Sequence, residues 1–241
     1  MVRTLLVRGM LVGILAGLLA AGFAYLFGEP QVDLAIAFEE HASAAAGAAA
    51  EAEPELVSRA VQSTLGLFTG IVVVGCALGG IFGLAFAYFH GRLGRWSPLL
   101  TAAVLAAAGF IVLVVVPQLK YPANPPAVGS PDSIAARTGF YFLLLGLSIA
   151  VAIAALGTAR QLMARLGGWS AALIGIAIYA IAMAGVMLAL PSISEVPADF
   201  SADVLWNFRA ASLGIGAVLW ATLGLAFGAL TQRQLTAGRG R

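Results

Sequence analysis

Side chains that react or bind metals are scarce in this 241-residue sequence. It contains one cysteine (Cys76), two histidines (His41 and His90) and one lysine (Lys120). A single cysteine excludes a disulfide framework within the chain, and two histidines cannot furnish a His-rich metal centre or several acid–base roles. Charged residues make up only 10% of the chain, whereas a soluble domain carries about a quarter. The composition therefore excludes an ordinary soluble domain.

Common catalytic motifs are absent as well. The sequence has no Gly-x-x-x-x-Gly-Lys-Ser/Thr loop, no Gly-x-Ser-x-Gly and no His-Glu-x-x-His. These absences exclude P-loop nucleotide hydrolysis and argue against serine hydrolase and zinc protease chemistry. Beyond the short arginine-containing C-terminal tail, nothing suggests nucleic-acid binding. We expect neither an enzyme nor a nucleic-acid-binding protein, and no resident cofactor.

Long apolar runs, by contrast, are abundant. Apolar residues form 61% of the chain, and its mean hydropathy is +0.98. We predict an all-α polytopic protein with a single membrane domain, because six runs approach or exceed the roughly 20 residues that a crossing needs. The runs are 5–27, 61–89, 99–116, 139–157, 169–190 and 211–230, with outer loops 28–60, 117–138 and 191–210. The first run is longer than the usual signal-peptide core, so we expect it to remain as a span.

Charged residues separate between the two sides of this layout. The N-terminus, the loops 90–98 and 158–168 and the C-terminus carry nine arginines and no acid; the other side carries four basic residues and every acid. Because Lys and Arg accumulate in cytoplasmic loops, both termini are predicted to be cytoplasmic. The acidic residues are Glu29, Asp33, Glu39, Glu40, Glu51, Glu53, Glu55, Asp132, Glu195, Asp199 and Asp203.

An internal repeat is visible in the second half of the chain. The string Arg-Leu-Gly-Arg-Trp-Ser at 92–97 returns as Arg-Leu-Gly-Gly-Trp-Ser at 165–170, and each copy opens a span that ends at a proline, Pro117 or Pro191. Arg59, Arg137 and Arg209 precede the even-numbered spans. The pattern predicts three tandem helical hairpins related by a pseudo-threefold axis along the membrane normal.

Small residues recur every four positions in the first two spans. Gly9, Gly13 and Gly17 are followed by Ala21, and the second span has the same spacing at 75, 79 and 83. Such stripes let helix backbones approach closely in lipid. They predict tight packing, either within the chain or in a homo-oligomer.

A proline-rich segment, Lys120–Gly129, interrupts the apolar runs. Five prolines lie between positions 117 and 131, and proline removes a backbone donor, so no helix can continue through the segment. Irregular backbone next to a bilayer survives only where protein buries it or water reaches it. The segment is therefore either an external cap or the wall of a water-filled cavity.

Several of these stretches resemble the CbtA family of predicted bacterial cobalt transporter subunits. The strings that carry the resemblance are Gly-Glu-Pro-Gln-Val-Asp at 28–33, Leu-Val-Ser-Arg at 56–59, the decapeptide 120–129, Arg-Thr at 137–138, and Glu-Val-Pro at 195–197 with Leu-Trp-Asn-Phe-Arg at 205–209. The resemblance extends over all six runs. It implies cobalt (Co²⁺) uptake across the bacterial cytoplasmic (inner) membrane, a link to cobalamin supply, and a small one-span, histidine-bearing partner, CbtB.

The ligand preferences of Co²⁺ indicate which residues of this chain could bind it. Co²⁺ favours imidazole and carboxylate ligands, and the chain has many outer carboxylates but almost no imidazole. Its acids could collect cations, while a partner supplies histidines. We predict that Glu29, Asp33 and Glu195 line an outer entrance, that His41 is a further candidate ligand, and that the proline-rich segment forms the lip. The predicted substrate pathway comprises Arg59, Lys120, Tyr121, Asn124, Arg137 and Arg209.

Other interpretations of these ionisable residues stay open. The acids and bases at the outer boundary could simply pair with one another. Alternatively, Arg59, Arg137 and Arg209 could converge as a ring in an anion-handling pore. The chain could also be a scaffold that assembles a partner without transporting anything.

Overall fold

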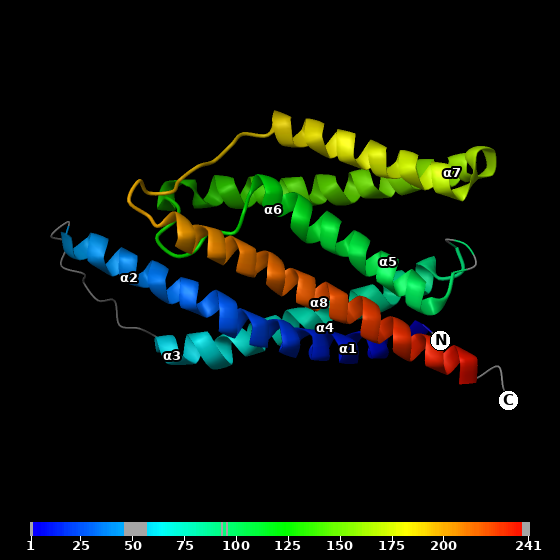
Figure 1. Ribbon diagram of the computed structural model, residues 1–241, viewed down its shortest axis with the longest axis horizontal. Coiled ribbons are helices and arrows are strands. Elements are labelled where there is room, and N and C mark those ends of the chain that lie inside the picture. Colours follow the sequence, from blue (N-terminus) through cyan, green and yellow to red (C-terminus); the bar gives the residue numbers. More distant parts are fainter. Residues whose placement is uncertain (1, 46–56, 93, 95, 238–241) are drawn as a thin grey trace. The chain divides into compact units, whose positions relative to one another are not determined.

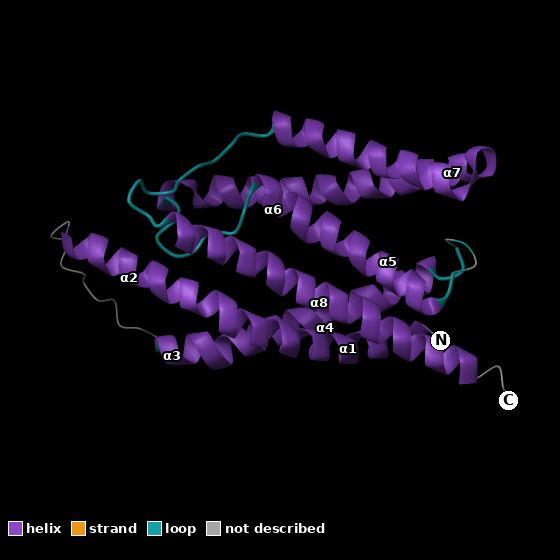
Figure 2. Ribbon diagram, in the orientation of Figure 1, coloured by secondary structure: helices purple, strands orange, loops and turns teal. Residues whose placement is uncertain are grey.

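The computed structural model describes residues 2–45, 57–92, 94 and 96–237, and among these residues there are helices and loops but no strand (Figure 2). In chain order, with π-helical and 3₁₀ segments included, the elements are α1 Val2–Phe23, π Ala24–Gly28, α2 Glu29–Ala45, α3 Arg59–Val61, π Gln62–Gly66, α4 Leu67–Phe89, α5 Pro98–Phe110, π Ile111–Val115, α6 Val116–Lys120, 3₁₀ Pro131–Ser133, α7 Ile134–Ala189 and α8 Ala202–Ala237. Glu51, Glu53, Glu55, Arg95, Arg239 and Arg241 lie outside the described residues.

Five helical stretches of the described chain are long and apolar enough to cross a membrane. They are Val2–Ala45, Arg59–Phe89, Pro98–Lys120, Pro131–Ala189 and Ala202–Gln234. The prediction of a helical membrane protein is therefore confirmed. The chain divides into two compact units: unit 1 comprises Met1–Phe110, Asn124–Ala127 and Asp199–Arg241, and unit 2 comprises Ile111–Ala123 and Val128–Ala198.

In unit 1, α1 and α4 lie side by side along the predicted glycine stripes (Figure 1). A Cβ atom built on Gly9 would lie 2.0 Å from the carbonyl oxygen of Gly79, and one on Gly13 would lie 2.2 Å from that of Gly75. Neither distance leaves room for a methyl group. The prediction of tight packing is confirmed within the chain, because the two backbones touch directly.

Aromatic side chains connect α4 and α8 in the unit 1 core. Phe82 packs edge-on against Phe227 at a ring-centroid distance of 5.4 Å, and Phe86 packs against Phe227 at 5.1 Å. Phe86 and Phe227 are both almost completely buried. Since Phe227 belongs to α8, these rings join α4 to α8, which also contacts α1 and α5.

Two prolines, Pro30 and Pro117, lie inside helical stretches, and the prediction that a span ends at Pro117 is wrong. The first helix continues through Pro30 to Ala45, and the third continues past Pro117 to Lys120. A proline lacks the N–H for the carbonyl four residues earlier, and its ring collides with that carbonyl. In both helices this carbonyl belongs to a π-helical segment that ends two residues before the proline. The wider π turn can relieve the collision, which explains why neither helix ends there.

In unit 2, α7 reverses direction near Gly167 (Figure 1). Gly167 has φ 77° and ψ 164°, which is not helical. The equivalent glycine of the first repeat copy, Gly94, also has a positive φ of 122°. Because side chains disfavour this region of φ, the repeated Arg-Leu-Gly string is a chain reversal signal in the second copy.

The two arms of α7 enclose a small apolar core with the end of the third helix. Val116, Tyr121, Leu144 and Met183 are its buried members. Beyond α6, residues 121–130 contain no helix, as the prolines predicted.

Candidate functional site

In unit 1, the arginine that begins the second helical stretch holds two carboxylates. Arg59, the first residue of α3, donates from Nη2 to Glu29 Oε2, and from Nη2 and Nε to Asp33 Oδ1 at 2.9 and 3.2 Å. Glu29 and Asp33 are four residues apart on α2 and so share one helix face. The Glu29 side chain is 12% exposed and that of Asp33 is 64% exposed. We call these three residues the acidic cluster; its formal charge is −1.

Unit 2 contains a second arginine–carboxylate group. Glu195 Oε2 accepts from the backbone N–H of Ser130 at 3.0 Å and lies 3.4 Å from Arg137 Nη1. A hydrogen bond from the Ser133 hydroxyl, the Ser130 N–H and the charge of Arg137 together lower the pKa of Glu195. We call Ser130, Arg137 and Glu195 the loop latch, because it joins the loop before α7 to the loop after it.

Glycine is required beside this latch. Gly129 has φ 137°, and a Cβ built there would lie 2.5 Å from Arg137 Nη1. A side chain would therefore be strained and would also displace the guanidinium. This requirement gives a physical role to the last residue of the decapeptide 120–129.

The start of the proline-rich segment is tied to the same loop. Lys120 Nζ donates to Ser192 Oγ at 3.1 Å, and the Tyr121 hydroxyl donates to the carbonyl of Pro191 at 2.8 Å. Burial raises the pKa of Tyr121. Both contacts lie within unit 2, and their partners belong to the same loop as Glu195 of the loop latch.

The last two predicted pathway residues meet in unit 1. Arg209 Nη2 donates to the side-chain oxygen of Asn124 at 2.8 Å. Asn124 belongs to the four residues of the proline-rich segment that group with unit 1, and Arg209 is on α8. The contact anchors the middle of the segment to this helix.

The predicted metal residues are distributed over both units. Glu29, Asp33 and His41 belong to unit 1, and Glu195 to unit 2. Across the part of the chain that the structure describes, no three His, Cys, Asp or Glu side chains gather in a way that could hold a metal ion. The ligand assignment therefore stays a prediction, and the acidic cluster contributes a pair of carboxylates that a cation could approach.

Sequence reasoning missed a polar contact in the middle of unit 2. The Ser148 hydroxyl donates to the carbonyl of Val112 at 2.7 Å and lies 2.8 Å from the Tyr179 hydroxyl. Ser148 is completely buried. Val112 lies within the third π segment, where the widened turn changes the usual helical hydrogen bonding. The sequence did contain a signal for this contact, because Ser148 and Tyr179 are polar residues near the centres of the apolar runs 139–157 and 169–190.

Comparison with known proteins identifies the family. The family model described as "Probable cobalt transporter subunit (CbtA)" matches residues 2–232. The chain belongs to the CbtA family. A CbtA protein is a transporter subunit, which is not an enzymatic role, and the five apolar helices agree with a multi-pass membrane protein. No curated protein and no solved structure matches this CbtA chain.

Membership in the CbtA family confirms the resemblance recorded by the sequence strings. The match covers both units and includes the acidic cluster and the loop latch. The word subunit in the family description also implies a partner.

Proposed function

We propose that this protein is the multi-pass subunit of a bacterial inner-membrane transporter that takes up Co²⁺ as its substrate. The family match over residues 2–232 is the observation that carries this proposal. In it, the chain forms the path through the bilayer, and a small histidine-bearing CbtB-like partner supplies the imidazole ligands that the chain lacks. Co²⁺ is cargo here and not a resident cofactor.

The proposed topology has six crossings, three tandem hairpins and both termini in the cytoplasm. Support comes from the reversal of α7 at Gly167, since a helix of 56 residues would be about 84 Å long if straight, far more than a bilayer core of about 30 Å. With α7 counted as two arms, every acidic residue falls on the outer side. The nine arginines on the opposite side support the cytoplasmic placement of the termini.

The acidic cluster is the best candidate for the outer cation entrance. Two carboxylates share one guanidinium, so a negative charge remains, and Asp33 is exposed to solvent. A divalent cation approaching Asp33 would compete with Arg59 for the same oxygens. Two carboxylates are too few for a selective Co²⁺ site, which is why the proposal includes histidines from the partner.

Glu195 is a weaker candidate for the same role. Its carboxylate already accepts from the Ser130 amide and faces Arg137. Within unit 2, Lys120 and Tyr121 hold the beginning of the proline-rich segment by their hydrogen bonds to Ser192 and Pro191. The pathway role of Arg209 and Asn124 is then to fix the middle of that segment.

Measurement of ⁵⁷Co²⁺ flux into liposomes tests the proposal. Purified protein is reconstituted alone and together with the small histidine-bearing partner, and uptake is followed after an inward cobalt gradient is applied. We expect saturable uptake that requires this chain and increases with the partner. Flux equal to that of protein-free liposomes, with both chains present and folded, would favour the scaffold interpretation.

The anion-pore alternative has less support. Arg59 is paired with Glu29 and Asp33, and Arg137 with Glu195. An anion would have to displace these carboxylates from the guanidinium groups. Arg209 likewise donates to Asn124, so the three arginines are engaged within their own units.

A further inference from the structure

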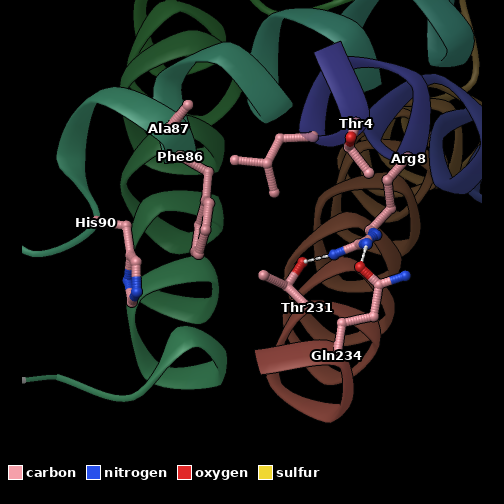
Figure 3. A pocket seen from close by; sticks show the side chains of 8 residues that line it. Thr4, Arg8, Phe86, Ala87, His90, Thr231 and Gln234 are labelled. Atoms are coloured by element: carbon pink, nitrogen blue, oxygen red, sulfur yellow. Dashed lines mark hydrogen bonds between the residues drawn. The ribbon is translucent and has the colours of Figure 1, made fainter. Parts of the chain in front are cut away.

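Unit 1 contains a cavity at the end opposite the acidic cluster, where α1 begins and where α4 and α8 end (Figure 3). Its volume is about 270 Å³, and residues of these three helices and His90, the residue after α4, line it. None of the lining residues is acidic. The cavity is therefore distinct from the proposed cation entrance in both position and charge.

One wall carries a positive charge and hydrogen-bonding groups. Arg8 Nη1 donates to the Thr231 hydroxyl at 2.8 Å, and Arg8 Nη2 donates to the side-chain oxygen of Gln234. In Figure 3 the guanidinium lies between these two partners, with Thr4 on the same side. A guanidinium has five N–H donors in a fixed planar array. The two contacts hold it in place and leave donors for an anion.

The facing wall is mostly apolar. Phe86 and Ala87 lie there, and the His90 ring stacks on Phe86 with a centroid distance of 4.9 Å. Leu5 of α1 adds a further aliphatic side chain. A free inorganic anion would gain nothing from these groups, whereas a molecule with a charged head and an apolar body could contact both walls.

The surroundings of the cavity favour an anion and oppose a cation. Residues 1–28, 56–131 and 204–241 contain no Asp or Glu, so α1, α4 and the cavity-lining part of α8 carry no negative side chain. Arg3 on α1 and Arg233 on α8 add positive charge near this end. A divalent metal leaving the protein here would meet repulsion, whereas a phosphate would be attracted.

We propose that this cavity binds a phosphate-bearing anion, namely the head group of an anionic phospholipid. Arg8 contacts the phosphate, the Thr231 and Gln234 side chains orient Arg8, and the partly exposed Ala87 and His90 side chains contact the glycerol and first methylene groups. Basic pockets between membrane helices bind such head groups. In the orientation proposed above, the lipid comes from the cytoplasmic leaflet. The inference concerns binding alone and does not depend on which ion is transported.

Native mass spectrometry of the delipidated, detergent-solubilised full chain tests this site. The lipids are dioleoylphosphatidylglycerol, which is anionic, and dioleoylphosphatidylcholine, which has no net charge. We expect selective binding of phosphatidylglycerol, and a loss of about tenfold in its affinity for Arg8→Gln, since a hydrogen bond to a charged group is lost. Arg3→Gln removes the same charge from the same helix outside the cavity, and we expect about the wild-type affinity.

A second variant covers the case in which Arg8→Gln does not fold. Gln234→Glu keeps an acceptor for Arg8 but places a carboxylate in the cavity, so it should also lose affinity for phosphatidylglycerol while retaining the melting temperature. Equal binding by wild type and Gln234→Glu would overturn the proposal. So would displacement of the lipid by millimolar inorganic phosphate, which would identify a soluble ligand, or a loss in Arg3→Gln as large as in Arg8→Gln, which would indicate surface attraction alone.

Discussion

The two units of this protein hold their helices together by different means. In unit 1, α1 and α4 meet backbone to backbone at Gly9 and Gly79, with no space for a methyl group. In unit 2, side chains make the key contacts: Ser148 reaches a main-chain carbonyl of the third helix, and Tyr121 reaches the loop after α7. The comparison shows that the unit 1 pair depends on the absence of side chains, whereas unit 2 depends on particular hydroxyl groups.

The arginine–carboxylate groups of the two units also differ, in the exposure of their carboxylates and in the partners that hold them. In the acidic cluster, two carboxylates share Arg59, and one of them is 64% exposed. In the loop latch, one carboxylate has an arginine and a backbone amide, and only 16% of its side chain is exposed. Similar residue types therefore give an accessible negative site in unit 1 and a closed structural contact in unit 2.

The largest effect is expected from a methyl group placed between α1 and α4. Gly79→Ala puts its Cβ 2.1 Å from the Gly9 carbonyl oxygen, so the helices must separate, and we expect a loss of about 3 kcal/mol or more in stability. Gly146→Ala on α7 is the matched control, since a Cβ there meets nothing within 4 Å. Thermal melting in detergent compares them. Equal melting temperatures would show that the close backbone contact does not stabilise unit 1.

Removal of the two carboxylates of the acidic cluster should lower cobalt uptake more than removal of the Glu195 carboxylate of the loop latch. We expect Glu29→Gln with Asp33→Asn to lower initial ⁵⁷Co²⁺ uptake at low cobalt by about tenfold or more, because a local negative field raises the concentration of cations at an entrance. Glu195→Gln should have a smaller effect. The measurement is uptake into liposomes at matched protein content.

Two exposed acids on the same helix provide the control for this comparison. Glu39→Gln with Glu40→Gln removes the same charge from α2 outside the cluster, and we expect near-normal uptake. Unchanged uptake after loss of Glu29, Asp33 and Glu195 together would disprove the cation entrance.

The smallest effect is expected from acidification of the loop latch. The folded-state pKa of Glu195 is lowered from its ordinary value of 4.5, so its stabilising contribution is present above pH 4.5 and is lost as the pH falls through the lower folded value. The difference in melting temperature between wild type and Glu195→Gln should be constant between pH 7 and about pH 5 and then shrink. Asp132→Asn, which removes an exposed neighbouring acid outside the loop latch, is the control variant. A difference that grows on acidification would contradict the assignment.

Much of the fold could be predicted from local sequence. The apolar runs identified helices of membrane-spanning length, the glycine spacing of the first two spans identified the helix pair that packs closely, and the prolines of the segment 120–129 excluded a helix there. The prediction also named acid–base pairing at the outer boundary as one interpretation, and the structure forms such pairs at Arg59 and Arg137.

The sequence by itself thus determined which segments are helical and apolar, because these properties depend on neighbouring residues along the chain. Only the tertiary structure decided that π turns carry two helices past Pro30 and Pro117, and that Ser148 bonds the carbonyl of Val112. It alone also assigned Glu29 and Asp33 to Arg59 and Glu195 to Arg137. Such pairings join residues that are distant in sequence, and several arginines were equally plausible partners until the helices packed.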